Sequence, residues 1–349
     1  MKRFLSLDVF RGMALLLMIL LYNQWGDSVF APLALHKADS VTLAELLFPT
    51  FLFLMGASMW FSSHRPLYGV RNTRTKTRQM GRIFRRTLIL FCLGLLLNWI
   101  PFETYFAFVR LPGVLQRIAL AYFFAAVLTL YLPRIRASVL SICILLVGYW
   151  LLLDSQGIEI IGRVDVAVLG SAHLLTPDFD PDGILSTLPA IASVLFGYIA
   201  GRLMDQPNSM SGGIGSLMVT GVLLAAAGLL LDLVSPMSRA WWTPSFVLFA
   251  AGCSMMVWSI LSFIIEYMQA QNWCEFFNLA GTNSLFVYCL STAMAKFFAY
   301  WGVTQAVYGF YQSYHLPDAM ASLLWSVTMV IFCWLLVWPL YRAKLYISA

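Results

Sequence analysis

Charged residues are scarce in this chain of 349 residues: only 11% are Asp, Glu, Lys or Arg, against about 25% in soluble globular proteins. Hydrophobic residues make up 60% of the chain, and the mean hydropathy is +0.79. Too few charges remain to cover a surface that faces water, which excludes a soluble protein. Lipid offers no partner to an open sheet edge, so we expect an all-α polytopic membrane protein, a single domain over 1–349.

Paired cysteines and the common motifs of soluble enzymes are also missing. The six cysteines form no CxxC pair, which indicates neither a metal site nor a disulfide framework. No GxSxG, Walker A, HExxH or convincing GxGxxG motif occurs. The net charge of +6 does not indicate a nucleic-acid partner, because the basic residues gather in one short stretch between apolar runs.

Long apolar runs are what the chain has in abundance. A membrane-spanning helix needs about 20 mostly apolar residues. Ten candidates are predicted, at 7–26, 43–62, 83–100, 113–132, 138–154, 186–203, 214–233, 243–266, 277–299 and 320–341.

The basic residues predict the orientation of these spans. The stretch 64–87 carries eight Lys or Arg residues and no acidic one, so we place it in the cytoplasm. Ten spans then put both termini in the cytoplasm, in agreement with Lys2 and Arg3 at one end and Arg342 and Lys344 at the other.

Polar residues inside spans need an explanation, because insertion of a central Asp or Arg costs about 2.5–3.5 kcal/mol. Asp8 and Arg11 share a helix face, where they could form an ion pair or where Arg11 could bind a phosphate. Asn23 could be a helix cap or a catalytic group. Gln116 and Arg117 near the outer surface could bind a ligand, or Arg117 could snorkel. The pair Asn283 and Ser284 could join helices or bind a ligand.

The predicted outer side adds histidines and carboxylates. The longest outer loop, 155–185, is acidic and contains His173 and Asp182, and it could fold over a cavity mouth. His36 lies in the first outer loop, and Glu45 follows at the start of the second span, as an orienting partner or a helix-end charge. These residues alone fit a transporter and a membrane transferase equally well.

Six segments, taken in order, resemble the bacterial relatives of heparan-α-glucosaminide N-acetyltransferase, including the transmembrane glucosamine N-acetyltransferases. These segments are Ser6–Gly12, Phe48–Pro49 with the apolar run to Gly56, Leu111–Ala119, Asp182–Ile191, Trp242–Val247 and Gly281–Tyr288.

The resemblance implies that an acetyl group passes from cytoplasmic acetyl-CoA to an amino sugar at the far face. It identifies His36 and Asn23 as the catalytic residues. Acetyl-CoA would be the co-substrate, with no metal, and would lie near Arg11, Asn283 and Ser284. The sugar would lie near five residues of the outer side: Gln116, Arg117, His173, Asp182 and Glu45.

The chemistry suits these assignments. An amine that attacks a thioester needs a base with a pKa near neutrality, which favours histidine, although an imidazole could also accept the acetyl group covalently. Asn23 could donate a hydrogen bond to the developing oxyanion.

The loop around His36 departs from the family pattern. The tryptophan and glycine of that pattern are absent, and Glu45 stands where the pattern has aspartate. We therefore keep two alternatives: O-acyl transfer to a cell-envelope glycan, and transport of a sugar or anion through the same polar cavity.

The family implies a location in the bacterial cytoplasmic (inner) membrane, and the lack of a lysosomal-type N-terminal extension agrees with that expectation. A homodimer is left open.

Overall fold

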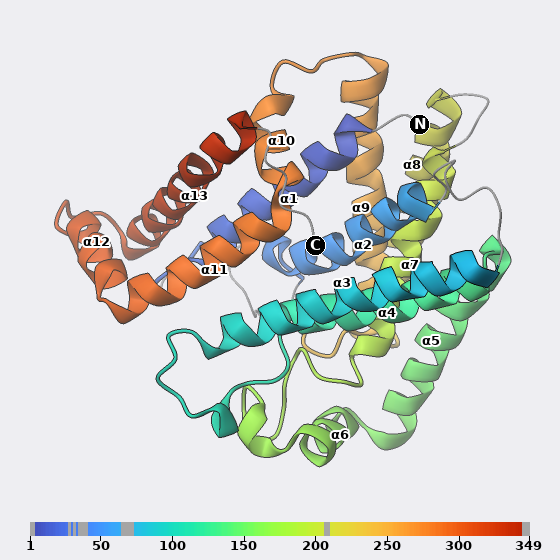
Figure 1. Cartoon of the computed structure of the whole chain (residues 1–349), viewed down its shortest axis with the longest axis horizontal. Coiled ribbons are helices and arrows are strands. Elements are labelled where there is room, and N and C mark those ends of the chain that lie inside the picture. The colour runs from blue at the N-terminus through green and yellow to red at the C-terminus, as the bar shows by residue number, and fades with distance from the viewer. Residues whose placement is uncertain are drawn as a thin grey trace. The chain divides into compact units, whose positions relative to one another are not determined.

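The computed structural model describes residues 4–26, 29–30, 33, 41–63, 73–205 and 210–343. All regular secondary structure in these residues is helical, which confirms the predicted all-α class (Figure 1). Eight helices are long and apolar enough to cross a membrane. The chain forms two compact units, described in turn below; the prediction of a single domain stays a prediction.

The first unit contains residues 49–99 and 104–267 of the described chain. Its helices are α2 (Leu43–Ser63, from Pro49 onward), α3 (Thr73–Trp99), α4 (Val114–Tyr131), α5 (Ile135–Gln156), α6 (Glu159–Leu169), α7 (Thr187–Met204), α8 (Met210–Asp232) and α9 (Pro244–Ser262). Single turns of 3₁₀-helix lie at Phe106–Phe108 (η3) and Ser171–His173 (η4), and α9 ends in a π-helical turn, Phe263–Tyr267 (η5).

Glycines let the helices of this unit pack backbone against backbone. A Cβ at Gly56 of α2 would collide with the carbonyl of Val194 on α7, and one at Gly197 of α7 would collide with the carbonyl of Phe53 on α2. Gly252 of α9 approaches α8 in the same way. Such close packing is typical of membrane helices, where hydrophobic burial between helices contributes little.

The second unit contains residues 4–48, 100–103 and 268–343 of the described chain. Its helices are α1 (Leu5–Tyr22), the first residues of α2, α10 (Cys274–Thr282), α11 (Ser284–Tyr300), α12 (Val303–Gln312) and α13 (Asp318–Arg342). Gly12 of α1 faces the carbonyl of Phe277 on α10, and Gly281 of α10 faces the carbonyl of Asp8 on α1. We call the contact of Gly12 and Gly281 the glycine seam.

The ten predicted spans all fall on helices, with three differences in detail. The predicted basic loop 64–87 is helical from Thr73, where α3 begins ten residues before the predicted span. The predicted span 277–299 is two helices, α10 and α11, separated at Asn283. The predicted outer loop 155–185 contains α6 and η4.

Candidate functional site

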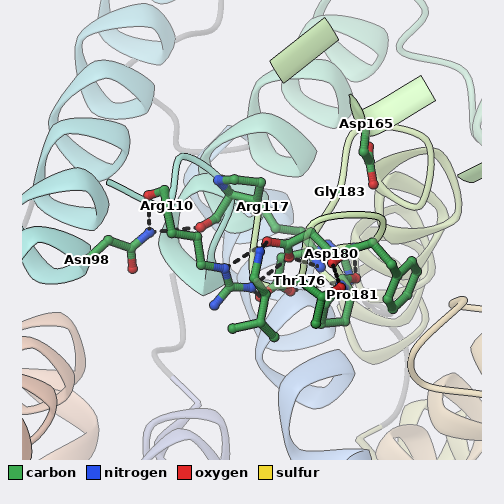
Figure 2. A network of polar contacts seen from close by, with 12 residues as sticks. Asn98, Arg110, Arg117, Asp165, Thr176, Asp180, Pro181 and Gly183 are labelled. Carbon is green, nitrogen blue, oxygen red and sulfur yellow. Dashed lines mark hydrogen bonds and ion pairs between the residues drawn. The ribbon is translucent and has the colours of Figure 1, made fainter. Parts of the chain in front are cut away.

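Polar side chains of the first unit converge where several of its helices begin or end. Asn98 lies at the end of α3, Arg117 in the first turn of α4, and Ser186 directly before α7. The predicted topology places all these helix ends on the outer side. Figure 2 shows the cluster, and we call Arg110, Arg117, Asp180, Asp182 and Ser186 the arginine network.

Arg110 binds Asp180 with two nitrogens. Its Nε lies 2.8 Å from Oδ2 of Asp180 and its Nη2 lies 2.6 Å from Oδ1, while Nη2 also lies 3.2 Å from Oδ2 of Asp182. Asp180 is fully buried. Burial by itself lowers the pKa of Arg110, but the hydrogen bonds and charges of Asp180 and Asp182 outweigh it and raise that pKa above its ordinary value. Such bidentate pairs are strong and directional.

Arg117 is 1% exposed although it is charged. It donates hydrogen bonds to the carbonyl of Pro181 and to the hydroxyl of Ser186, and its Nη1 lies 3.6 Å from Oδ1 of Asp182. The guanidinium also stacks over the ring of Trp242 at 4.7 Å. Asp182 therefore lies between the two arginines: its Oδ2 contacts Arg110 and its Oδ1 contacts Arg117.

Gln116 and His173 lie beside the network. A Cβ at Gly113 would meet both Gln116 and Asn98, whose Nδ2 donates to the carbonyls of Arg110 and Pro112 at 2.9 and 2.8 Å. The ring Nδ1 of His173 lies 2.7 Å from the carbonyl of Val109. The structure thus brings four predicted sugar-binding residues together: Gln116, Arg117, His173 and Asp182.

The predicted acetyl-CoA residues gather in the second unit, at the glycine seam. Arg11 is adjacent to Gly12 and pairs with Asp8 at 3.3 Å. Asn283 is fully buried between α10 and α11, two residues after Gly281, and Ser284 begins α11. The first residues of a helix present free N–H groups and a positive dipole end, which suit a phosphate.

The remaining predicted residues are spread along the second unit. Asn23 follows α1, and its Nδ2 donates to the carbonyl of Ile19 at 2.7 Å. Twelve residues separate it from Arg11 on the same helix, or about 18 Å along the axis. Glu45 is 6% exposed in the first turn of α2. His36 lies outside the described residues.

Sequence reasoning assigned no role to Arg110, Asp180, Asp165 or Trp242. The sequence does contain a signal for Arg110 and Asp180. Arg110 is the single cation of its predicted outer loop, and the acidic stretch 155–185 is predicted to lie on the same outer side. Complementary charges in two loops favour a pair, but nothing in the spacing selects Asp180 among the five acidic residues of that stretch.

Comparison with known proteins comes from a family model and from two relatives. The family model, described as heparan-alpha-glucosaminide N-acetyltransferase, catalytic, matches residues 3–230. A relative of Homo sapiens called heparan-alpha-glucosaminide N-acetyltransferase is 25% identical in an alignment 363 positions long, which covers 85% of this chain and 54% of the relative. The relative of the same name from Mus musculus is 23% identical in an alignment 411 positions long, which covers 99% of this chain and 60% of the relative. The chain thus spans a little over half the length of these relatives.

Proposed function

The chain belongs to the heparan-α-glucosaminide N-acetyltransferase catalytic family, and from that premise we propose that it is a transmembrane acetyltransferase that acetylates the amino group of a glucosamine-type sugar with acetyl-CoA. The observation that carries the proposal is the match of the catalytic family model over residues 3–230, which includes α1 to α7, most of α8 and the whole arginine network.

The reaction joins the sugar amine to the acetyl carbonyl and breaks the thioester bond. The amine attacks the carbonyl carbon, the oxyanion forms, and the thiol of CoA leaves as the amine loses its proton. His36 is proposed as the base and Asn23 as the donor to the oxyanion. Covalent transfer through the imidazole of His36 gives the same overall products.

In this proposal the two substrates bind from opposite sides of the membrane. Arg11, Asn283 and Ser284 would bind the nucleotide end of acetyl-CoA from the cytoplasm. The thioester would reach toward Asn23, about 18 Å further along the helix. The residues in and beside the arginine network of the first unit are proposed for the sugar, at the periplasmic face of an inner membrane, and Glu45 of the second unit is proposed as a sugar residue on the family resemblance alone. The geometric support lies within each unit separately: Arg11 and Asn283 lie near the glycine seam of the second unit, and Arg117 contacts Asp182 in the first.

One specific observation favours a second acceptor. The pattern around His36 lacks the tryptophan and glycine of the family, and Glu45 replaces an aspartate, so the sequence around the proposed catalytic residue differs from the family pattern. The second candidate is O-acyl transfer to a hydroxyl of a cell-envelope glycan, with the same donor.

The experiment measures thiol release from acetyl-CoA by the purified protein, with and without glucosamine. We expect glucosamine-dependent release that His36→Ala abolishes while acetyl-CoA still binds. The matched control is His315→Asn, because His315 is exposed. Normal turnover by His36→Ala would remove the catalytic assignment. Release with an envelope glycan but not with glucosamine would favour the O-acyl candidate.

The sidedness is tested in membrane vesicles. Acetyl-CoA does not cross a bilayer, so in vesicles with glucosamine on both sides of the membrane we expect turnover from added acetyl-CoA when the vesicles are inverted and none when they are right-side-out. The reverse result would contradict the proposed cytoplasmic donor site.

A further inference from the structure

Helix α6 holds the acidic segment 178–184 at two points. A Cβ at Gly162 of α6 would collide with the carbonyl of Asp178, so only a glycine allows that approach. One turn further, Oδ1 of Asp165 accepts the backbone N–H of Ile184 at 2.8 Å. The same carboxyl group faces Gly183, where a Cβ would collide with it. In the sequence the two contacts flank Asp180 and Asp182, which the arginines bind; Figure 2 shows Asp165 beside Gly183, and Arg110 and Arg117 near Asp180.

Asp165 itself is fully buried. Within the described part of the chain, its second carboxyl oxygen, Oδ2, has no hydrogen-bond partner. Three ionisable side chains are near enough to interact with its charge: Arg117 from α4, Tyr149 from α5 and Asp180 from the acidic segment. A buried carboxylate with one oxygen unsatisfied is costly, whereas a protonated carboxyl keeps the bond to Ile184 through Oδ1 and buries no charge.

We propose that Asp165 is a positioning residue whose protonation determines how firmly the acidic segment, and with it Asp182, is held against the two arginines. The neutral carboxyl holds the segment at no electrostatic cost. The ionised carboxylate places a negative charge beside Asp180 in a buried site and loosens the segment. The part of this inference that concerns binding of the acceptor rests on the proposed function. The part that concerns how firmly the acidic segment is held does not.

The pKa of Asp165 agrees with this geometry. Its pKa is raised from 3.8 to about 6: burial is the main cause, the Ile184 N–H opposes it, and smaller effects come from Asp180, which raises the pKa, and Arg117, which lowers it. A pKa that is higher in the folded than in the unfolded chain gives a stabilisation that is complete below about pH 4 and is lost as the pH rises through about 6. The acidic segment should therefore be held most firmly in mild acid and less firmly at neutral pH.

The test compares Asp165→Asn with the wild-type protein between pH 5 and pH 7.5. The amide oxygen of asparagine can still accept the Ile184 N–H, but the side chain does not ionise. We expect the wild-type thermal midpoint to fall between these pH values more than that of Asp165→Asn. The variant should also show a smaller rise in KM for glucosamine over this range, while its affinity for acetyl-CoA stays unchanged.

The matched control is Asp178→Asn, because Asp178 lies in the same segment with an exposed side chain. This control should keep the wild-type pH dependence. The inference is overturned when Asp165→Asn keeps the wild-type pH dependence of the thermal midpoint, or when Asp178→Asn loses it equally.

A measurement on the unmodified protein guards against a variant that fails to fold. Amide hydrogen exchange across 180–186, corrected for the intrinsic effect of pH, should lose protection with a midpoint near pH 6. Flat protection from pH 5 to pH 8 would overturn the inference. Neither this measurement nor the thermal midpoint requires acetyl transfer, so a failure here is distinguishable from a failure of the proposed function.

Discussion

The arginine network and the glycine seam are organised by different forces. In the network, two arginines bind two aspartates, and Arg117 is 1% exposed, so charge and hydrogen bonds fix the position of each side chain. At the seam, α1 and α10 meet backbone to backbone at Gly12 and Gly281, and the nearby Arg11 side chain is 21% exposed. The network uses its charges to hold its own structure, whereas the seam leaves the charge of Arg11 accessible to a ligand.

Replacement of a seam glycine is the change with the largest expected effect. In Gly12→Val, the side chain would collide with the carbonyl of Phe277, and a backbone atom cannot rotate away. We expect a loss of about 3 kcal/mol or more, seen as little folded protein after purification.

The control for this prediction is Gly309→Val on α12 of the same unit. Among the described residues, nothing lies within 4 Å of a Cβ built at Gly309. This variant should fold like the wild type. A well-folded Gly12→Val protein would show that α1 and α10 are not held by backbone contact.

Removal of the buried arginine should have the next largest effect. Arg117→Met keeps much of the side-chain volume but removes the contacts of this guanidinium with the Pro181 carbonyl and with Oδ1 of Asp182, which keeps only its contact with Arg110. Loss of one partner from a buried ion pair costs about 3–5 kcal/mol. We expect a strong fall in the thermal midpoint, and unchanged stability would contradict the structural role of the network.

Arg11→Met is the matched substitution at the seam and should have the smallest effect on the fold. Partly exposed ion pairs contribute about 0–1 kcal/mol, so the thermal midpoint should change little. The affinity for acetyl-CoA, measured by isothermal titration calorimetry, should fall about tenfold, which corresponds to about 1.4 kcal/mol. Stability losses of equal size in Arg11→Met and Arg117→Met would remove the distinction between the two regions.

The sequence was sufficient to predict most of the long helices and several neighbours in the candidate site. Apolar runs placed ten predicted spans on helices, because lipid demands length and hydropathy that can be counted, and eight helices of the described chain are long and apolar enough to cross a membrane. Helix α6 escaped prediction, since its eleven residues are too short for a span and its buried face contains an aspartate. A hydropathy profile detects apolar residues, so it does not detect a helix face that is buried through a glycine and a carboxyl group.

The sequence predicts which residues belong to the candidate site better than it predicts which of them contact each other. Four residues stand out in the sequence, either for the free-energy cost of inserting a polar residue into the membrane or for their predicted outer position, and the structure places them together: Gln116, Arg117, His173 and Asp182. The pairing of Arg110 with Asp180 depends on which helix ends meet, and that depends on contacts such as Gly162 with Asp178. Arg110 and Asp180 lie 70 residues apart, and no local sequence pattern records which of the two loops' residues meet.

The break between α10 and α11 lies close to the glycine seam and affects how these helices adapt to the thickness of the bilayer. A straight helix adapts to a membrane of different thickness by tilting as a rod. Here the nine residues of α10 extend about 14 Å and the seventeen of α11 about 26 Å, so neither matches a hydrocarbon layer of about 30 Å alone. Lateral pressure and thickness mismatch would therefore be taken up as bending at Asn283, two residues from the contact of Gly281 with α1.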